Sequence, residues 1–185
     1  MFICNRKTME NNGQELCDQK TRKRRIWKEY QKEIPDDRYF YVRSCIRQTF
    51  FPASEQMFLK ILRDDLGKDI YENPHHTTCS GIGYHGDVIP LETSMTIVAR
   101  QFALMAEAGY ENLAVSCITS FGLYSEFLET WKHFPQVRER IADHLRKATG
   151  RELVLPKCVA HASDIVYRLK DEIAARAKYL SLIHI

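Results

Sequence analysis

The sequence predicts an α/β fold in which a parallel sheet alternates with helices inside a single domain. Three observations support this class. Short aromatic or β-branched runs recur along the chain, longer stretches with apolar residues at helical spacing separate them, and glycine or proline stands at the boundaries. Strands that alternate with helices of this length are typical of parallel sheets, because a parallel connection needs a crossover of about a dozen residues or more.

The individual elements follow from the same signals. Pro35 ends a basic helical stretch, Pro52 suits a first helical turn, and Gly67, Gly109 and Gly150 are placed to end helices. The expected order is strand 38–42, helix 51–66, strand 69–72, helix 91–108, strand 113–115, helix 120–147 with a break at Pro135, strand 152–155 and helix 161–178.

Composition excludes several classes of protein. With 185 residues and 44% apolar content, the chain can bury one substantial core. No run approaches the roughly 18 apolar residues that span a bilayer, and residues 1–20 lack the apolar stretch of a secretion signal, so we expect a cytoplasmic protein without a transmembrane segment. In that compartment, six cysteines argue against a disulfide framework and favour metal binding or thiol chemistry.

Three cysteines follow the predicted strands. Cys45 comes shortly after the first strand, Cys79 follows the second, and Cys117 follows the third. Because right-handed crossovers place the carboxyl ends of parallel strands at one edge of the sheet, we expect these cysteines to converge there. Three thiols in that position can bind a soft metal or cluster, exchange disulfides as a pair, or pack as small hydrophobes, and zinc is among the metals that fit.

The spacing of these cysteines carries a resemblance to a known family. The chain reads Cys45, then after 33 residues Cys79-Ser80-Gly81, and then Cys117-Ile118-Thr119-Ser120. This pattern resembles the CCG motif of the heterodisulfide reductase B-subunit family, in which a lone cysteine precedes Cys-Cys-Gly and a CxxC pair. The resemblance extends over about 38–179, and it is greatest for the heterodisulfide-reductase-like B subunits of sulfur oxidisers.

The resemblance implies an oxidoreductase subunit that acts on disulfide or persulfide sulfur through an iron–sulfur cluster. Carried over by position, Cys45, Cys79 and Cys117 match cluster ligands, whereas Ser80 and Ser120 stand where the family has cysteines. Serine oxygen is a poorer ligand for iron than thiolate. Two outcomes are therefore open: a 4Fe-4S type cluster with an incomplete protein ligand set, or a non-catalytic assembly module that has lost its cluster.

The family resemblance also implies partners and a larger subunit. The expected partners are iron–sulfur and flavin subunits of the same complex, with a sulfur-carrying protein or small disulfide as substrate and no nucleic acid. Residues 1–34 are expected to form a polar and basic extension, 35–179 a CCG-type domain, and 180–185 an unrelated tail. Because family members carry two such halves, we expect that the second half is missing and that this chain alone is inactive.

Other candidate residues are assigned simpler roles. His75, His76 and His85 flank Cys79 and could supply a nitrogen ligand, although solvated loop positions are the commoner role for such histidines. Tyr84 and Cys158 are expected to be packing residues, and Gly81 and Gly83 to leave room for a bulky cluster. The cysteines with no recognised ligand spacing are Cys4 and Cys17.

Overall fold

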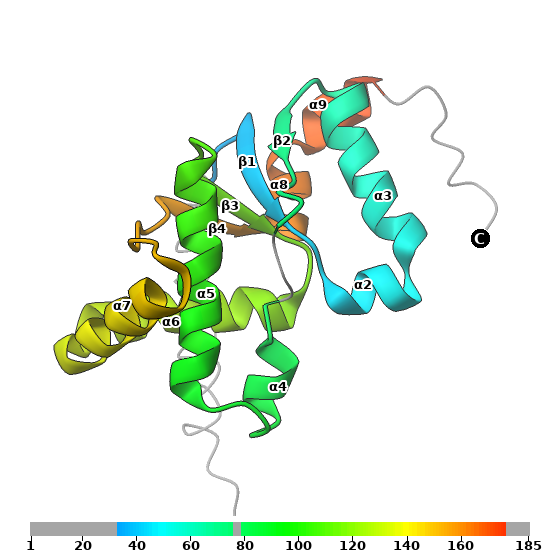
Figure 1. Cartoon of the computed structure of the whole chain (residues 1–185). Helices are drawn as coiled ribbons and strands as arrows, with labels where there is room; N and C mark the ends of the chain where they lie inside the picture. The colour runs from blue at the N-terminus through cyan, green and yellow to red at the C-terminus, as the bar shows by residue number, and fades with distance from the viewer. Residues whose placement is uncertain (1–32, 76–78, 177–185) are drawn as a thin grey trace, which may run out of the picture. The chain divides into compact units, whose positions relative to one another are not determined.

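A computed structural model describes residues 33–75 and 79–176 (Figure 1). Its sheet contains β1 (Arg38–Val42), β2 (Asp69–Tyr71), β3 (Asn112–Val115) and β4 (Cys158–His161). The strand order is β2-β1-β3-β4 and every neighbouring pair is parallel. The predicted α/β class with a parallel sheet is confirmed.

Helices connect and cover the strands. Pro52 is the first residue of its helix and Gly150, with a φ of 71°, follows another, as their conformational preferences predict. The helices are α2 (Cys45–Phe50), α3 (Pro52–Lys60), the π-helical turn η1 (Ile61–Asp65), α4 (Gly81–His85), α5 (Leu91–Glu107), α6 (Ile118–His133), α7 (Pro135–Thr149), α8 (Ala162–Arg168) and α9 (Lys170–Arg176).

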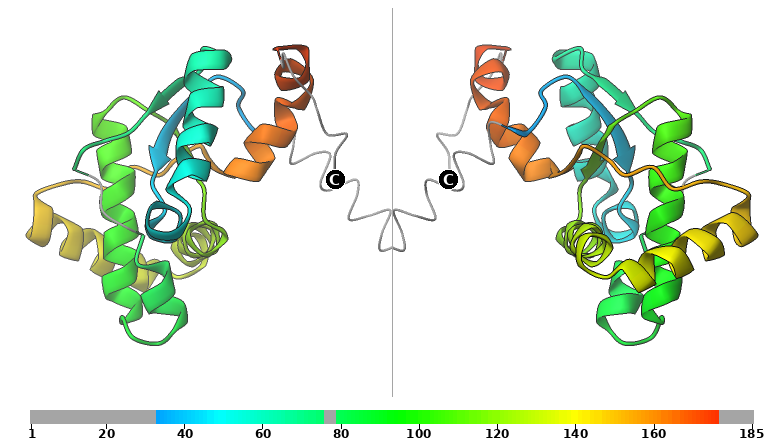
Figure 2. Two further views of the ribbon diagram at one scale, coloured as in Figure 1. Left: turned by 90° about the vertical axis from the view of Figure 1, so that its right-hand side faces the viewer. Right: turned by 90° about the vertical axis from the view of Figure 1, so that its left-hand side faces the viewer.

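The two faces of the sheet are buried by different helices. Phe40 and Val42 of β1 pack in one cluster with residues of α5, α6 and α7. Tyr41 points to the opposite face, where its ring lies 5.7 Å from that of Phe58 in α3. Figures 1 and 2 show the sheet between α5 and α3. Full burial of such side chains contributes about 1.5–3 kcal/mol each, which fixes the strands on which the site is built.

The fourth strand differs from the prediction. Residues 152–155 form no strand, and Val154 and Leu155 are 50% and 40% exposed. Pro156 follows them and cannot donate to a neighbouring strand. Pairing begins only afterwards, where the Lys157 N–H donates to the Glu111 carbonyl over 2.7 Å and Cys158 pairs with Asn112. The prediction of a strand at 152–155 was therefore wrong, and the strand lies a few residues later.

The helix boundaries also differ in two places. The predicted helix 51–66 is preceded by α2, and Pro52 separates the two because its ring cannot continue a helix from the preceding turn. The final predicted helix is divided at Leu169 into α8 and α9. His161 belongs to β4 and caps α8, since its Nδ1 accepts from the Ser163 N–H over 3.3 Å.

Several expectations fall outside the described residues. Cys4, Cys17 and His76 lie there, as do nearly all of the basic extension and the whole of the tail 180–185, so the division of the chain into three segments stays a prediction. Within 33–75 and 79–176, no helix combines the length and apolar character that crossing a membrane requires.

Candidate functional site at the carboxyl edge of the sheet

The strand order places the three cysteine-bearing connections next to one another. Strands β2, β1 and β3 are consecutive neighbours, so the segments that leave their carboxyl ends start at the same edge. Cys45 is the first residue of α2, Cys117 caps α6, and Cys79 precedes α4 by two positions. The Cys79 thiol lies near enough to Cys117 and Cys45 for charge on either to raise its pKa.

Ser120 is the side chain that joins two of these segments. Its hydroxyl oxygen lies 2.9 Å from the sulfur of Cys79. The same hydroxyl also interacts favourably with the Cys117 thiolate. Ser120 is 3% exposed and Cys79 is 5% exposed, so this contact is shielded from water. The last position of the CxxC-like segment 117–120 therefore meets Cys79 from the start of α6.

Ser80 occupies a different environment from Ser120. Its hydroxyl donates to the carbonyl oxygen of Cys79 over 2.6 Å and makes no described contact with a sulfur. With a φ of 56°, Ser80 has a left-handed backbone conformation, which residues other than glycine adopt infrequently. The two serines expected to stand at cysteine positions of the resembled motif are thus not equivalent, because of the two hydroxyls only that of Ser120 has a described contact with a thiol.

Glycine fits positions 81 and 83 for two different structural reasons. A Cβ on Gly81 would lie 3.1 Å from the Thr119 carbonyl oxygen and 3.3 Å from the Cys79 sulfur, so glycine allows α4 to approach α6 beside the thiol. The Gly81 N–H also donates to that sulfur over 3.3 Å. A Cβ on Gly83 would instead lie 2.5 Å from Cδ1 of Ile89. Gly83 thus makes room for Ile89, and the expectation that it clears space for a cluster was wrong.

The thiols of Cys79 and Cys117 have opposite pKa shifts. Burial raises the pKa of Cys79, and hydrogen bonds from Ser120 and Gly81 offset this only in part. Burial also acts to raise the pKa of Cys117, but the backbone and side-chain groups of Ser120 and Thr119 outweigh it, so the net pKa is lowered. The first turn of α6 therefore favours the Cys117 thiolate, as helix starts commonly do for cysteine.

A buried tyrosine, Tyr124, lies near the sulfur of Cys79. Tyr124 of α6 is fully buried, and its hydroxyl finds no hydrogen-bond partner among the described residues. Burial raises its pKa well above the ordinary value, and charge on Cys79 adds to the shift. Sequence patterns assign this residue to the core because it falls on the apolar face of a helix. Its proximity to Cys79 depends on the packing of α6 against the segment before α4.

The two described histidines of this region, His75 and His85, do not join the thiols. The His75 backbone interacts with Asn73 and Arg100, and within 33–75 and 79–176 its side chain is not part of a metal-binding group. His85 is exposed, next to Gly122 of α6. Tyr84 packs against the core and donates to Glu126 over 2.6 Å, which together with burial raises its pKa to about 12. Tyr84 is therefore a packing residue, as the sequence suggested.

Cys158 lies at the opposite edge of the sheet. It is the first residue of β4 and pairs with Asn112, the first residue of β3, whereas Cys117 follows the end of β3. It is half-buried, so it is less enclosed than the buried packing thiol that we expected. Its position separates it from the other three cysteines by the length of the strands.

An open groove leads to Cys117 along the same edge. Its volume is about 700 Å³, and its lining is mainly apolar side chains from α2, α3, α6 and α8. Arg47 and His161 are the basic side chains in this lining, and Ser44 and Ser116 contribute hydroxyls. Burial lowers the pKa of His161. A groove of this size can admit a small organic ligand to the Cys117 thiol.

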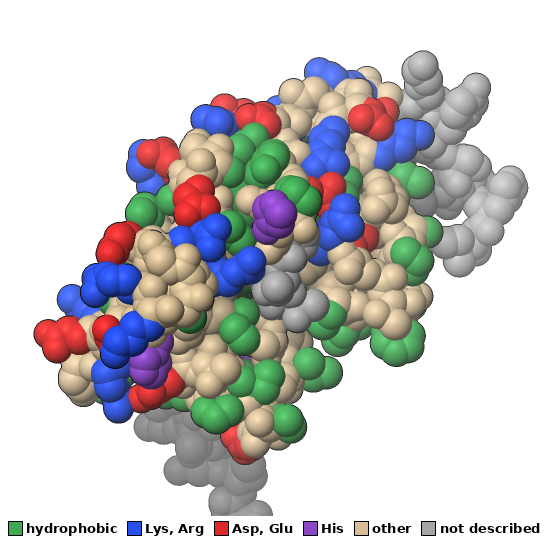
Figure 3. Space-filling view, viewed as in Figure 1, with side chains coloured by type: hydrophobic (Ala, Val, Ile, Leu, Met, Phe, Trp, Pro, Cys, Tyr) green, Lys and Arg blue, Asp and Glu red, His purple; other side chains and the backbone are tan. Residues whose placement is uncertain are grey.

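Exposed apolar side chains surround this edge. They gather on the face shown in Figure 3 over α2 and α4. The most exposed of these large side chains are Phe50, Phe51, Met57, Ile82, Val88 and Ile118. Groups of large exposed apolar side chains are typical of sites where another protein segment binds.

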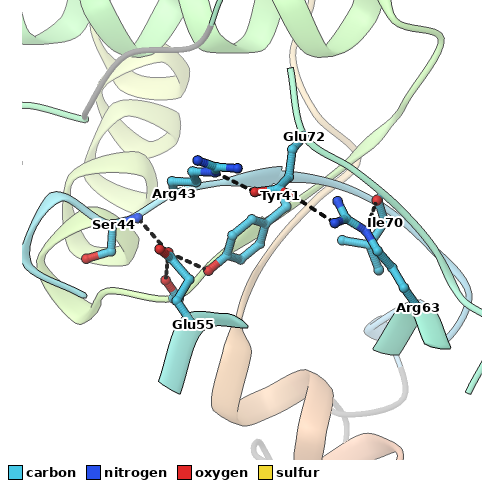
Figure 4. Close-up of polar contacts among 8 residues, drawn as sticks. Tyr41, Arg43, Ser44, Glu55, Arg63, Ile70 and Glu72 are labelled. Atoms are coloured by element: carbon cyan, nitrogen blue, oxygen red, sulfur yellow. Dashed lines mark hydrogen bonds and ion pairs between the residues drawn. The ribbon is translucent and has the colours of Figure 1, made fainter. Parts of the chain in front are cut away.

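Buried and partly buried polar contacts support the strand ends (Figure 4). Glu72 accepts from Arg43 over 2.5 Å and from Arg63 over 2.9 Å, which joins the chain after β2 to the chain after β1 and to η1. Glu55 of α3 accepts from Tyr41 and from the Ser44 N–H. The sequence patterns did not identify Glu55, although a glutamate in phase with the buried residues Phe58, Leu59 and Leu62 is a usable signal.

The donor types fit a soft metal or an iron–sulfur cluster, because the Cys79 thiol contacts a buried hydroxyl and two further thiols lie nearby. Gly81 leaves one side of the Cys79 sulfur without a side chain. In 33–75 and 79–176, however, no three His, Cys, Asp or Glu side chains are already arranged to hold a metal ion.

The fold and the site define a class of protein: an α/β domain whose parallel sheet carries converging cysteines at its carboxyl edge. A comparison with curated proteins gives a more particular likeness. The chain is 27% identical over 153 residues to the B subunit of ferredoxin:CoB-CoM heterodisulfide reductase from Methanosarcina acetivorans, an alignment that covers 79% of this chain and 48% of the relative. The resemblance to heterodisulfide reductase B subunits is thereby confirmed, and this chain spans about half the length of that relative. No family model matches the chain.

Proposed function

We propose that this chain forms part of a heterodisulfide-reductase-like subunit that transfers electrons to or from a disulfide or persulfide sulfur. Cys45, Cys79 and Cys117 would hold an iron–sulfur cluster, with Ser120 beside them. The observation that supports this most directly is the contact between Cys79 and Ser120, which joins the two halves of the motif at the sheet edge. The likeness to a heterodisulfide reductase B subunit supports the class of reaction.

The chain's own residues would perform three tasks in this function. The lowered pKa of Cys117 favours its thiolate, the form that binds metal. Ser120 stabilises that thiolate and contacts Cys79. The apolar groove would admit a sulfur compound to Cys117 and exclude part of the surrounding water. When bound, a cluster would supply the exchange of electrons.

The proposal includes partners and a compartment. The relative's name includes ferredoxin and the CoB-CoM heterodisulfide, and we propose a related redox complex for this chain, with iron–sulfur and flavin subunits. The substrate would be a small disulfide or a sulfur-carrying protein. The exposed apolar residues over α2 and α4 would contact other parts of such a complex. A cytoplasmic location remains part of the proposal.

Anaerobic metal analysis tests the cluster. The chain is purified without oxygen, reconstituted with iron and sulfide, and assayed for both elements and for visible absorbance. Cys117→Ser should remove most of the bound iron, whereas the matched control Cys158→Ser, at the opposite edge, should retain it. A colourless protein without iron or sulfide after reconstitution would reject the cluster, and stoichiometric zinc in its place would favour a thiol-dependent zinc protein.

A second candidate is a non-catalytic assembly module of the same complex that has lost its cluster. It is supported by Ser80, whose hydroxyl is bound to a backbone carbonyl, and by the lack of a ready three-ligand group among the described side chains. In this case Cys79→Ala would alter neither the metal content nor the activity of the assembled complex. A large loss of either would reject the module in favour of the cluster.

A further inference from the structure

Glu55 is a buried carboxylate with three donors on one oxygen. It is 2% exposed on α3, and its Oε1 accepts from the Tyr41 hydroxyl over 2.8 Å, the Ser44 N–H over 3.0 Å and the Ser116 hydroxyl over 3.2 Å. Figure 4 shows its side chain directed at Tyr41 and at the backbone of Ser44. A buried carboxylate is costly unless such partners satisfy it.

Two of these donors lie directly before cysteines of the site. Ser44 precedes Cys45 and caps α2, accepting the Arg47 N–H over 3.1 Å. Ser116 precedes Cys117, which caps α6. The two segments follow adjacent strands, β1 and β3, and Glu55 reaches both from a third element. A single carboxylate oxygen thus ties together the segments from which two thiols project.

Tyr41, the third donor to Glu55, does not lie next to a cysteine of the site. Tyr41 lies within β1, where parallel pairing with Ala114 already fixes its backbone. Tyr41 is buried, with 0% exposure against 6% for Ser116, and its hydroxyl reaches the same oxygen. Loss of the Tyr41 contact would weaken the anchoring of Glu55, whereas loss of the Ser116 contact would release a segment that carries a cysteine. A comparison of variants at Tyr41 and Ser116 therefore separates an effect on general stability from an effect on thiol placement.

We propose that Glu55 is a positioning residue that sets the relative placement of Cys45 and Cys117. Its meaning for catalysis depends on the proposed function, in which both thiols bind one cluster. The placement itself is a property of the metal-free chain. A buried acceptor that loses its donors is costly, so three hydrogen bonds to one oxygen let Glu55 keep two short segments in one arrangement.

Chemical bridging of the two thiols tests this placement. The full chain is prepared without metal, and every cysteine except Cys45 and Cys117 is replaced by serine. A short bis-maleimide first reacts with one thiol, and the rate of closure onto the second reports their effective concentration. Ser116→Ala should slow closure by at least about threefold and Glu55→Ala by about tenfold, while Tyr41→Phe should stay within about twofold. Glu55→Gln, which keeps an acceptor oxygen, should recover part of the rate.

Controls separate placement from unfolding and from reactivity. Thermal unfolding is measured for each variant, and a monofunctional maleimide gives the intrinsic rate of each thiol. If Glu55→Ala does not fold, the comparison of Ser116→Ala with Tyr41→Phe decides the matter. Equal closure rates for these two folded variants would overturn the role of Glu55 without affecting the iron analysis. Conversely, a chain that binds no iron but shows the expected rates would reject the proposed function and retain the positioning role.

Discussion

The sulfur of Cys79 and the hydroxyl oxygen of Ser120 lie 2.9 Å apart at the carboxyl edge of the sheet. This contact links the segment before α4 to the first turn of α6, two parts of the chain separated by 41 positions. Ser120 stands where the motif that the sequence resembles is expected to have a cysteine, so we propose that a hydroxyl occupies the place of a sulfur ligand. Cys117, three residues earlier, is favoured as a thiolate by the same helix turn.

Restoring sulfur at position 120 should strengthen metal binding. Ser120→Cys places a fourth thiol beside Cys79, and we expect Cd²⁺ to bind the metal-free chain at least about tenfold more tightly, a gain of about 1.4 kcal/mol. Ser80→Cys is the matched control, because the hydroxyl of residue 80 binds a backbone carbonyl. Absorbance from cadmium–thiolate bonds measures the Cd²⁺ affinity of both variants. Equal gains at the two positions would contradict the difference between the serines.

The thiols of the metal-free chain should react in a defined order. At neutral pH, iodoacetamide should modify Cys117 about tenfold faster than Cys79, because Cys117 has the lower pKa and Cys79 is 5% exposed. Ser120→Ala removes an interaction that lowers both pKa values, so both reactions should slow at this pH. Mass spectrometry of quenched digests gives the rates. Faster modification of Cys79 would show that the electrostatics of the site are assigned incorrectly.

Glu72 should make stability depend on acidity. Burial acts to raise its pKa, but Arg43 and Arg63 outweigh this and hold the pKa below its usual value. A lowered folded-state pKa stabilises the protein above the unfolded-state value of about 4.3, and the contribution is lost as the pH falls through the folded-state pKa. Both arginines are partly exposed, so we expect about 1 kcal/mol after screening.

Glu72→Gln measures this contribution. The difference in free energy of unfolding between the wild type and the variant should be largest at neutral pH and should shrink as the solution is acidified below about pH 4. Glu152→Gln, which removes an exposed partner of Arg146, is a suitable control with a smaller effect at neutral pH. A difference that grows on acidification would contradict the lowered pKa of Glu72.

Gly83 should tolerate a side chain only when Ile89 is shortened. Gly83→Ala would place a Cβ 2.5 Å from Cδ1 and 2.8 Å from Cγ1 of Ile89, and overpacking of this kind costs about 1–3 kcal/mol. Ile89→Ala removes both atoms. In a double-mutant cycle of unfolding free energies, the two changes together should therefore cost less than the sum of their separate effects. Simple additivity would show that the helix backbone moves instead.

Sequence periodicity predicted the parallel sheet because its first three strands are short, apolar and bounded by clear breaks. It misplaced the fourth, since residues 152–155 have a strand-like composition but precede Pro156 and include the exposed side chains of Val154 and Leu155. The position of the fourth strand is defined by the pairing of Cys158 with Asn112, a contact between distant parts of the chain. Local composition cannot distinguish an exposed apolar loop from an edge strand.

The site was predictable in part for a similar reason. Topology rules place Cys45, Cys79 and Cys117 at one edge, because each follows a strand of the same parallel sheet. They do not distinguish Ser80 from Ser120, since that difference depends on the left-handed backbone at residue 80 and on the packing of α6. Glu55 was missed because its three donors lie 14, 11 and 61 positions away along the chain.

The lowered pKa of Cys117 has a consequence for the survival of the protein in air. Oxygen and peroxides attack thiolates before thiols, so we expect Cys117 to become a sulfenic acid before the buried Cys79 does. The large core residues of helix α6 lie further along, at Leu123, Tyr124 and Phe127. Oxidation would therefore remove the proposed metal ligand, and we expect the domain to remain folded with an unchanged circular dichroism spectrum.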